Sequence, residues 1–586
     1  MKNSKNSEKN NDLISSLFTG ISKAIYSAQN SELKNLIVAL LLFSMCIVLG
    51  TFLLATFGAI TNYDSLTAHM ARVMYYRQFG KIGYYGANYW AQDIHPYVLP
   101  FVHLMLLKIS GWENSVNFVQ WFSILITSAF SSLAIRNITD NRAISIITGC
   151  LSFFFVNTVI QASTTQNDLV LTALVAIQLW ITTSGFSLKR KYIFLWLFFL
   201  LGLGIKQTFV LYQLPVLIVL VWNEQFQWKN LFQAVPAVTG FLLTLIAGPV
   251  FLYHMIDNYL NLGNPFGFRD VMESHSFWGR DWLFILKAGT RNLCRYGFDF
   301  FTLDGLNTYP FLSQMFLKAN NFIKWNLAQL LKPLTGNLEV GNEIRVGFFY
   351  LKSFSIQDSS SFWGPIGPFL IFPSLLIATI SFFRFRKLEP DFIFSICILV
   401  VFIFQAFSSN YDMWRGRYFN EAVPFASCLG GIIIHRFYLK KYAKIWILTA
   451  LLFSGLASFG AVFFRHDATI IWSKKPLSVF SSSREELMTG KNPELIHAIE
   501  FVRALPADVD SIGLFTTENM PEYLLFDIEG NRKFFPMNSY GRPSPWKNTK
   551  VDAILFTDNV HTPKQGDMLI STFGINNEKI YFRRKN

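Results

Sequence analysis

Long apolar segments recur along the whole chain. A helix of roughly 20 apolar residues is long enough to cross a lipid bilayer. Only 15% of the residues are charged and 52% are hydrophobic, whereas soluble domains carry about 25% charged residues. We therefore predict an all-α polytopic membrane protein with about eleven transmembrane helices, near residues 36–57, 115–136, 143–160, 168–186, 191–204, 208–222, 234–253, 363–383, 391–408, 419–436 and 443–463.

Basic residues between these segments orient the chain. The formal net charge is +14, but Lys and Arg stand in short clusters between apolar segments rather than in one basic domain, so we expect no nucleic-acid partner. Basic loops of membrane proteins face the cytoplasm. In this chain all the basic loops lie on the same side of the membrane as the N-terminus if the apolar residues 97–109 do not cross the membrane. Because about 13 residues is short for a span, this segment is predicted to dip into the outer leaflet.

The resulting topology divides the chain into three parts. Residues 1–35 form a polar cytoplasmic tail whose apolar residues recur every four positions, which is typical of an amphipathic helix on a membrane surface. Residues 36–464 form a transmembrane domain of the plasma (inner) membrane, with large outer loops at 58–114 and 254–362. Residues 465–586 have the composition of a small extracytoplasmic α/β domain. It lacks a glycine-rich phosphate loop, so we assign it recognition or scaffolding, and structural support fits equally well.

Two acids stand where the chain leaves the membrane on the outer side. Asp64 follows the first apolar segment, with His69 and Arg72 close behind it, and Asp168 begins the fourth segment. Ionisable groups beside lipid are costly and therefore indicate a functional site. The alternative is that each Asp only caps a helix. Paired acids can deprotonate an acceptor hydroxyl or hold a divalent cation, so Asp64 and Asp168 are the catalytic candidates and, if a metal binds, its ligands.

Cationic side chains are predicted on the same side of the membrane. Lys206 lies in a Gly-x-Gly-x-Lys turn between two short apolar segments, and Arg415 and Arg417 lie in the outer loop before the tenth span. Lys206 fits either a lysine extending toward lipid headgroups or a phosphate ligand. The arginines run against the positive-inside trend, and arginine binds phosphate with two hydrogen bonds; nonspecific binding of anionic lipid is the alternative.

Polar neighbours complete the set of substrate-binding candidates. His69 and His95 lack a third ligand at metal spacing, so they are predicted to form hydrogen bonds rather than to bind zinc. No cofactor is certain, and a divalent cation stays possible. The candidates for substrate binding are His69, Arg72, Gln92, His95, Gln166, Asn167, Lys206, Arg415, Arg417 and Tyr418.

The order of these motifs resembles the GT-C class of integral-membrane glycosyltransferases, in particular the branch of protein O-mannosyltransferases and the lipid A aminoarabinose transferase. The shared order is an acid after the first span, a His-Pro helix that dips, a second acid after the third span, a Gly-x-Gly-x-Lys turn and a large outer loop. In this sequence these are Asp64, His95-Pro96, Asp168, Gly202–Lys206 and residues 254–362. A lone Asp64 replaces the acidic pair common in O-mannosyltransferases.

The resemblance implies transfer of a sugar from a polyprenyl-phosphate-linked donor to an acceptor hydroxyl of a glycan, lipid or protein at the outer face of the membrane. Asp64 would act as general base, and Asp168 would orient it or a cation. The phosphate leaving group would be stabilised by Lys206, Arg72, Arg415 and Arg417. A polysaccharide polymerase and a lipid-linked glycan transporter are the alternatives. A transporter should show related halves and charges deep within several spans, and the sequence shows neither.

Overall fold

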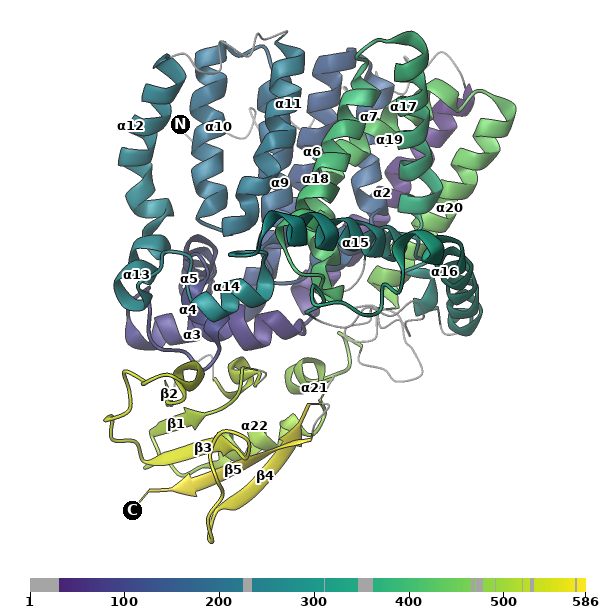
Figure 1. Ribbon diagram of the computed structural model, residues 1–586. Coiled ribbons are helices and arrows are strands. Elements are labelled where there is room, and N and C mark those ends of the chain that lie inside the picture. The colour runs from purple at the N-terminus through teal and green to yellow at the C-terminus, as the bar shows by residue number, and fades with distance from the viewer. Residues whose placement is uncertain are drawn as a thin grey trace, which may run out of the picture.

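The computed structural model describes residues 31–224, 234–309, 311–345, 362–464, 470, 478–490, 492–518, 520–526, 532–574 and 577–585. The amphipathic helix predicted in the N-terminal tail lies outside these residues. Figure 1 shows three layers: a bundle of upright helices, a layer of helices lying across one end of the bundle, and a small sheet domain beneath that layer.

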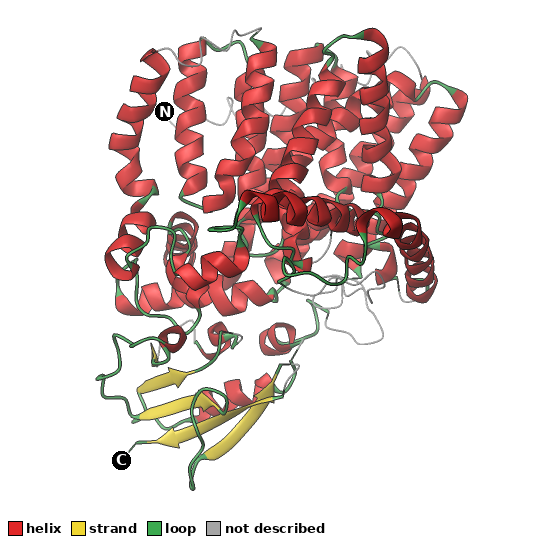
Figure 2. Ribbon diagram, in the orientation of Figure 1, coloured by secondary structure: helices red, strands yellow, loops and turns green. Residues whose placement is uncertain are grey.

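The upright helices arise from the apolar segments. Each segment predicted to span the membrane forms a helix or a pair of successive helices in the bundle (Figures 1 and 2). Their bounds are α2 (Ser31–Phe57), α6 (Phe118–Thr139), α7 (Arg142–Leu151), α9 (Asp168–Thr183), α10 (Leu188–Leu203), α11 (Gln213–Asn223), α12 (Ala234–Phe251), α17 (Phe372–Phe385), α18 (Pro390–Ser408), α19 (Val423–Phe437) and α20 (Lys441–Phe463), with the short α8 (Val156–Gln161) after α7.

The predicted number of eleven spans is not confirmed. Among the described residues, 5 helices are long and apolar enough to cross a membrane, or 6 if the pair Gly240–Phe251 and Tyr253–Leu262, bent by 64°, counts as one span. Others are shorter apolar helices, such as Asp168–Thr183 and Gln207–Asn223. At a rise of ~1.5 Å per residue these fall short of a hydrocarbon core about 30 Å thick.

The second layer comes from the predicted outer loops. The loop after α2 supplies α3 (Met70–Phe79), α4 (Trp90–Ile94) and α5 (Val98–Ser110), and the long loop after α12 supplies α13 (Tyr253–Leu262), α14 (Arg269–His275), α15 (Trp282–Phe300) and α16 (Ser313–Thr335). Helix α5 is the segment expected to dip, and it lies in this layer rather than among the upright helices (Figure 1). The sequence pattern of residues 284–300 and 310–331 predicts amphipathic surface helices rich in aromatic residues, and these correspond to α15 and α16.

The C-terminal part is a small α/β domain, as predicted. Its five-stranded sheet has the order β2-β1-β3-β5-β4, with the first three strands parallel and β5 antiparallel to both β3 and β4. The sequence pattern predicts a helix that starts at residues 521–526, with proline in its first turn; the structure has a short 3-10 turn there instead, Glu522–Leu525. The element bounds are α21 (Arg484–Thr489), α22 (Leu495–Ala504), β1 (Ser511–Phe515), β2 (Lys533–Pro536), β3 (Ala553–Thr557), β4 (Met568–Phe573) and β5 (Glu578–Arg584).

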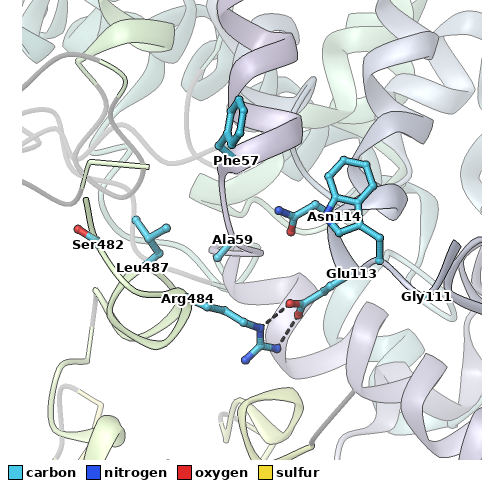
Figure 3. A pocket seen from close by; sticks show the side chains of 9 residues that line it. Phe57, Ala59, Gly111, Glu113, Asn114, Ser482, Arg484 and Leu487 are labelled. Carbon is cyan, nitrogen blue, oxygen red and sulfur yellow. Dashed lines mark hydrogen bonds and ion pairs between the residues drawn. The ribbon is translucent and has the colours of Figure 1, made fainter. Parts of the chain in front are cut away.

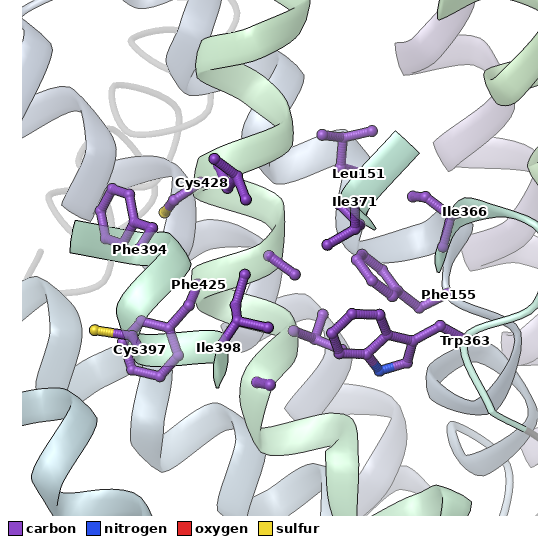
Figure 4. Close-up of a cluster of buried hydrophobic side chains, with 14 of the residues drawn as sticks. Leu151, Phe155, Trp363, Ile366, Ile371, Phe394, Cys397, Ile398, Phe425 and Cys428 are labelled. Carbon is purple, nitrogen blue, oxygen red and sulfur yellow. The ribbon is translucent and has the colours of Figure 1, made fainter. Parts of the chain in front are cut away.

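An aromatic core supports the segment that precedes α19. Figure 4 shows part of this core, where Trp363 and Phe155 lie among apolar side chains of α7, α18, α19 and the residues that precede α17. Trp363 donates a hydrogen bond from its indole N–H to the carbonyl of Phe419 at 3.2 Å. The Phe419 ring is fully buried and contacts Phe300 and Phe402 at centroid distances of 4.9 and 4.7 Å. Phe419 therefore anchors the neighbouring residues 417 and 418.

Candidate active site

Asp64 begins a π-helical turn, Ser65–His69, that leads into α3. Its side chain caps no N–H of that turn. Asn62 does so instead, because its Oδ1 accepts hydrogen bonds from the Ser65 N–H at 2.9 Å and from the Ser65 hydroxyl at 3.0 Å. The alternative that Asp64 serves as a helix cap is therefore wrong. Its carboxylate remains 32% exposed and is available for other contacts.

Asp168 is the first residue of α9, and its side chain is only 1% exposed. Its Oδ1 forms an ion pair with the ammonium of Lys206. Lys206 belongs to the tight turn between α10 and α11, where a side chain at Gly202 would overlap the ring of Phe209. Glycine is needed at that close approach, and the compact turn aims Lys206 at the second acid.

Arg417 joins the two acids. Its Nη1 pairs with Asp64 Oδ2, and its Nε lies 3.8 Å from Asp168 Oδ2. The ring of Tyr418 supports both cations, with the Lys206 ammonium 3.8 Å and the Arg417 guanidinium carbon 5.2 Å from its centroid. Cations are attracted to the face of an aromatic ring. Four segments far apart in the sequence thus meet in one cluster of two acids and two cations.

Gln166 and Asn167 border this cluster. The Gln166 amide donates hydrogen bonds to Asn62 Oδ1 at 3.1 Å and to Asp64 Oδ2 at 3.4 Å. The Asn167 amide donates to the carbonyl of Ile205 at 3.5 Å, next to Lys206. These contacts tie the loop before α9 to both the first acid and the lysine turn.

Two predicted phosphate ligands have other partners. The buried guanidinium of Arg72 donates to the Tyr76 hydroxyl at 2.6 Å and to the carbonyls of Pro96 and His95. Arg415 donates to the Ser409 hydroxyl and to the carbonyl of His275 at 2.8 Å. Both arginines hold loops together. The structure therefore does not bring the Arg72 guanidinium into the acid cluster. The guanidinium carbon of Arg415 lies 5.6 Å from the Tyr418 ring centroid, but among the described residues Arg415 forms an ion pair with neither acid.

Gln92 contacts the turn that follows Asp64, and His95 contacts its neighbours Trp90 and Arg72. The buried amide of Gln92 donates to the carbonyl of Thr67 at 2.7 Å. The His95 ring packs against Trp90 with 5.7 Å between ring centroids, and the His95 carbonyl accepts the hydrogen bond from Arg72. Both side chains shape the loop around the turn.

The electrostatics of the loop residues follow from this geometry. Burial would raise the pKa of Asp64, but the Arg417 guanidinium outweighs it and holds the pKa below its usual value. Burial lowers the pKa of His69 to about 4, so this imidazole is neutral at pH 7. For Tyr418, burial acts to raise the pKa, yet Lys206 and Arg417 bring it below its usual value. In the resting site the charges of the acids are therefore matched by Lys206 and Arg417.

The donor set for a divalent cation is small. Among the described residues, no group of three or more His, Cys, Asp or Glu side chains could hold a metal ion. Hard cations take about six or more oxygen ligands, and Asp64 and Asp168 are each already paired with a cationic side chain. The divalent cation stays a prediction that transfer assays with and without EDTA would test.

Several residues of the site were not predicted. Asn62 caps the turn. Glu421 is fully buried, and neither of its carboxylate oxygens has a hydrogen-bond partner in the part of the chain that the structure describes. Its spacing of four residues from Arg417 could have drawn attention to it, but it stands in an apolar segment. Other buried atoms of the site without a hydrogen-bond partner in the described structure are Thr165 Oγ1, Gln166 Oε1, Asp168 Oδ2 and Arg417 Nε. Such atoms mark places where water or a ligand binds.

A cavity of about 280 Å³ lies apart from this cluster. It is lined by the end of α2, the turn before α6 and residues of α21, and none of the predicted site residues contributes to it (Figure 3). Glu113 and Arg484 form a paired ion contact at its edge. The cavity therefore marks the junction of the helical layers with the C-terminal domain.

The layered helical architecture, with its polar cluster at one end of the bundle, defines a membrane protein with the fold of GT-C class glycosyltransferases, as the resemblance predicted. ArnT from Cupriavidus metallidurans bound to undecaprenyl phosphate aligns with a TM-score of 0.53 at 12% identity, over 92% of this chain and 97% of its own. Its apo state aligns with a TM-score of 0.52 at 11% identity, over 93% and 98%. This likeness establishes the fold.

An oligosaccharyltransferase from Archaeoglobus fulgidus aligns with a lower TM-score of 0.45, at 10% identity, over 88% of this chain and 68% of its own. No protein-family model matches the sequence, and no curated protein matches it.

Proposed function

We propose that this protein is a glycosyltransferase that moves a sugar from a polyprenyl-phosphate-linked donor to an acceptor hydroxyl at the outer face of the plasma membrane. The observation that carries the proposal is the meeting of Asp64, Asp168, Lys206 and Arg417 in one cluster. Such a transferase needs a base for the acceptor and positive charge for the leaving phosphate, and this cluster contains both.

Lys206 and Arg417 are the proposed phosphate ligands. Both lie at the end of the upright helices where the second layer begins, so a lipid phosphate could reach them while its chain stays among apolar side chains. Arg417 Nε is buried and has no hydrogen-bond partner among the described residues, so this N–H is available to donate to a phosphate oxygen. ArnT, which shares the fold, has been solved with undecaprenyl phosphate bound.

Asp64 is the proposed general base. The acceptor oxygen attacks the anomeric carbon of the donor sugar and forms the new glycosidic bond, while the bond from that carbon to the phosphate oxygen breaks. The electron pair of the broken bond stays on the phosphate, and the acceptor proton passes to the Asp64 carboxylate. The negative charge that grows on the phosphate is stabilised by Lys206 and Arg417. Asp168 holds Lys206 in place.

The ion pair between Asp64 and Arg417 has to open during this cycle. A carboxylate paired with a guanidinium has a low pKa and is a weak base. A donor phosphate competes with Asp64 for the guanidinium, so donor binding draws Arg417 away and raises the basicity of Asp64. The base is then strongest when the leaving group is in place, which restrains loss of the acceptor proton without a donor.

The test is a transfer assay in membranes that contain this protein, with a polyprenyl-phosphate sugar as donor. We expect Asp64→Asn, which keeps the shape and removes the basic carboxylate, to lower sugar transfer by at least about 100-fold, the range for loss of a general base. The matched control is Asp270→Asn, because Asp270 is an exposed acid of α14 in the same layer. Equal activity of D64N and D270N would overturn the role of Asp64. Product length distinguishes transfer of one sugar from polymerisation.

A further inference from the structure

The C-terminal domain packs directly against the loop that carries Asp64. Buried residues of α3, including Met70 and Val73, share one hydrophobic core with Leu514, Leu524 and Phe534 of that domain. The side chain of Gln78 also forms two hydrogen bonds with the main chain of Phe534, at 2.7 and 2.8 Å. The domain is thus joined to the first outer loop as one packed unit.

A single carboxylate lies at the centre of this contact. Glu522, in the 3-10 turn after β1, is 1% exposed. It accepts hydrogen bonds from Thr516 of its own domain at 2.7 Å and from three side chains of the first outer loop: Asn88 at 2.7 Å, Tyr75 at 3.1 Å and Gln92 at 3.5 Å. All four donors are neutral groups.

A buried carboxylate without a paired cation is costly unless it is fully hydrogen-bonded. Removing this acceptor takes one hydrogen bond from each of its buried donors and so weakens the restraint on their orientation. The geometry of the loop donors therefore depends on Glu522, which comes from a different domain.

One of these donors reaches the proposed base. The Gln92 amide that faces Glu522 also donates to the carbonyl of Thr67 at 2.7 Å, and the Gln92 Oε1 accepts from the Tyr85 hydroxyl at 2.5 Å. Thr67 lies in the π-helical turn Ser65–His69, which starts directly after Asp64. Continuous contacts therefore run from Glu522 through Gln92 to the turn that sets the direction of Asp64.

We infer that Glu522 is a positioning residue for sugar transfer and that the C-terminal domain, through the Glu522–Gln92–Thr67 contacts, holds Asp64 at the site. This inference rests on the proposed function. It gives the domain a defined role that is neither substrate recognition nor general support. Lys206 and Arg417 are not part of these contacts, so the orientation of the base should depend on Glu522 while phosphate binding should not.

The test uses the full chain in membranes and compares Glu522→Ala with Arg484→Ala. Arg484 pairs with Glu113 at another contact between the same domain and the first outer loop (Figure 3). Among the described residues, neither side chain forms a hydrogen bond or an ion pair with the turn Ser65–His69. We expect E522A to lower kcat by at least tenfold with the donor KM changed less than twofold, and R484A to keep kcat within twofold. Hydrogen exchange of residues 62–72 should rise in E522A and not in R484A.

Gln92→Leu provides a second variant in case E522A folds poorly, because it breaks the link to Thr67 and leaves Glu522 with three donors. We expect Q92L to reproduce the loss of kcat and the Q92L/E522A pair to lose no more than either alone, since contacting residues act non-additively. Multiplicative losses, or an E522A kcat equal to that of R484A, would overturn the inference. If D64N retains full activity, the proposed function fails instead.

Discussion

The Arg417 guanidinium lies between the two acids of the site: its Nη1 pairs with Asp64 Oδ2, and its Nε is 3.8 Å from Asp168 Oδ2. This relationship gives Arg417 two states in the proposed cycle. Without donor it neutralises the base, and with donor it contacts the phosphate. Several measurable consequences depend on this exchange.

The pH dependence of transfer should differ between free and donor-bound enzyme. The acid limb of kcat/KM reports the free enzyme and that of kcat reports the donor complex. Arg417 holds the pKa of Asp64 below its usual value in the free site, so the acid limb of kcat should lie at higher pH than that of kcat/KM. Coincident limbs in the two pH profiles would show that donor binding does not release Asp64.

Substitution Arg417→Gln removes the group that lowers the pKa of Asp64. Burial then acts unopposed by this cation, so the acid limb of kcat/KM should move to higher pH. We also expect kcat to fall by about 100-fold, the typical effect of losing one stabilising donor for the developing charge. Arg417→Lys keeps the positive charge and serves as the control. The acid limb of its kcat/KM profile should lie near that of the wild type. An acid limb of kcat/KM that does not move in R417Q would contradict the ion pair between Arg417 and Asp64.

Lys206 is predicted to act on the donor. Lys206→Met should raise the donor KM at least tenfold, because one of two phosphate ligands is lost. It should also lower the free energy of unfolding by about 3–5 kcal/mol, because Asp168 stays buried and loses its close ion pair, with only the more distant Arg417 left to face it. The double variant Lys206→Met/Asp168→Asn should regain much of the stability and none of the donor affinity. If the double variant recovers both its stability and its donor affinity, Lys206 has only a structural role.

Arg72 should affect stability rather than donor binding. Its guanidinium is 2% exposed and donates to one hydroxyl and two carbonyls of the first outer loop. Arg72→Met leaves these acceptors unsatisfied at a cost of about 1–3 kcal/mol each. The melting temperature in detergent should therefore fall clearly while the donor KM of the folded fraction stays within twofold. If the donor KM of R72M rises as much as that of K206M, Arg72 is a phosphate ligand after all.

Asp93 should make the first outer loop sensitive to pH. Burial raises its pKa to about 7, although main-chain N–H groups including that of Ala87 at 2.7 Å favour the ionised form. The folded state therefore binds more protons than the unfolded chain. The contribution of Asp93 to the free energy of unfolding is at its full value below pH ~4 and is lost as the pH rises through about 7. The melting temperature should fall from pH 6 to pH 8, roughly across the pKa. The slope should be flatter in Asp93→Asn, and equal slopes would contradict this assignment.

The grouping of these four charged residues could be expected from the sequence because each of them stands at the end of an apolar segment. Once the topology placed these ends on one side, Asp64, Asp168, Lys206 and Arg417 had to lie in the same layer. Their convergence to ion-pair distance could not be predicted, since it depends on how the helices pack. The directions of the Arg72 and Arg415 side chains could not be predicted either. Their guanidinium groups bind main-chain carbonyls whose positions depend on how the loops fold.

The layered fold was predictable for a related reason. Apolar segments indicated the upright helices, and amphipathic segments indicated α15 and α16 in the layer across their ends. The number of spans could not be predicted, because several apolar segments form helices of 10–17 residues. Hydropathy does not show where such a helix ends. Glu522 was also missed, since a carboxylate buried between two domains has no local pattern in the sequence.

The most direct measurement of the central claim is the rate of sugar transfer from a polyprenyl-phosphate donor by wild type, Asp64→Asn and Arg417→Gln in the same membranes. We predict that wild type transfers sugar and that both variants lose at least about 100-fold, because one lacks the base and the other lacks the phosphate ligand. Transfer by D64N at the wild-type rate, or no transfer by the wild type from any such donor, would contradict the account.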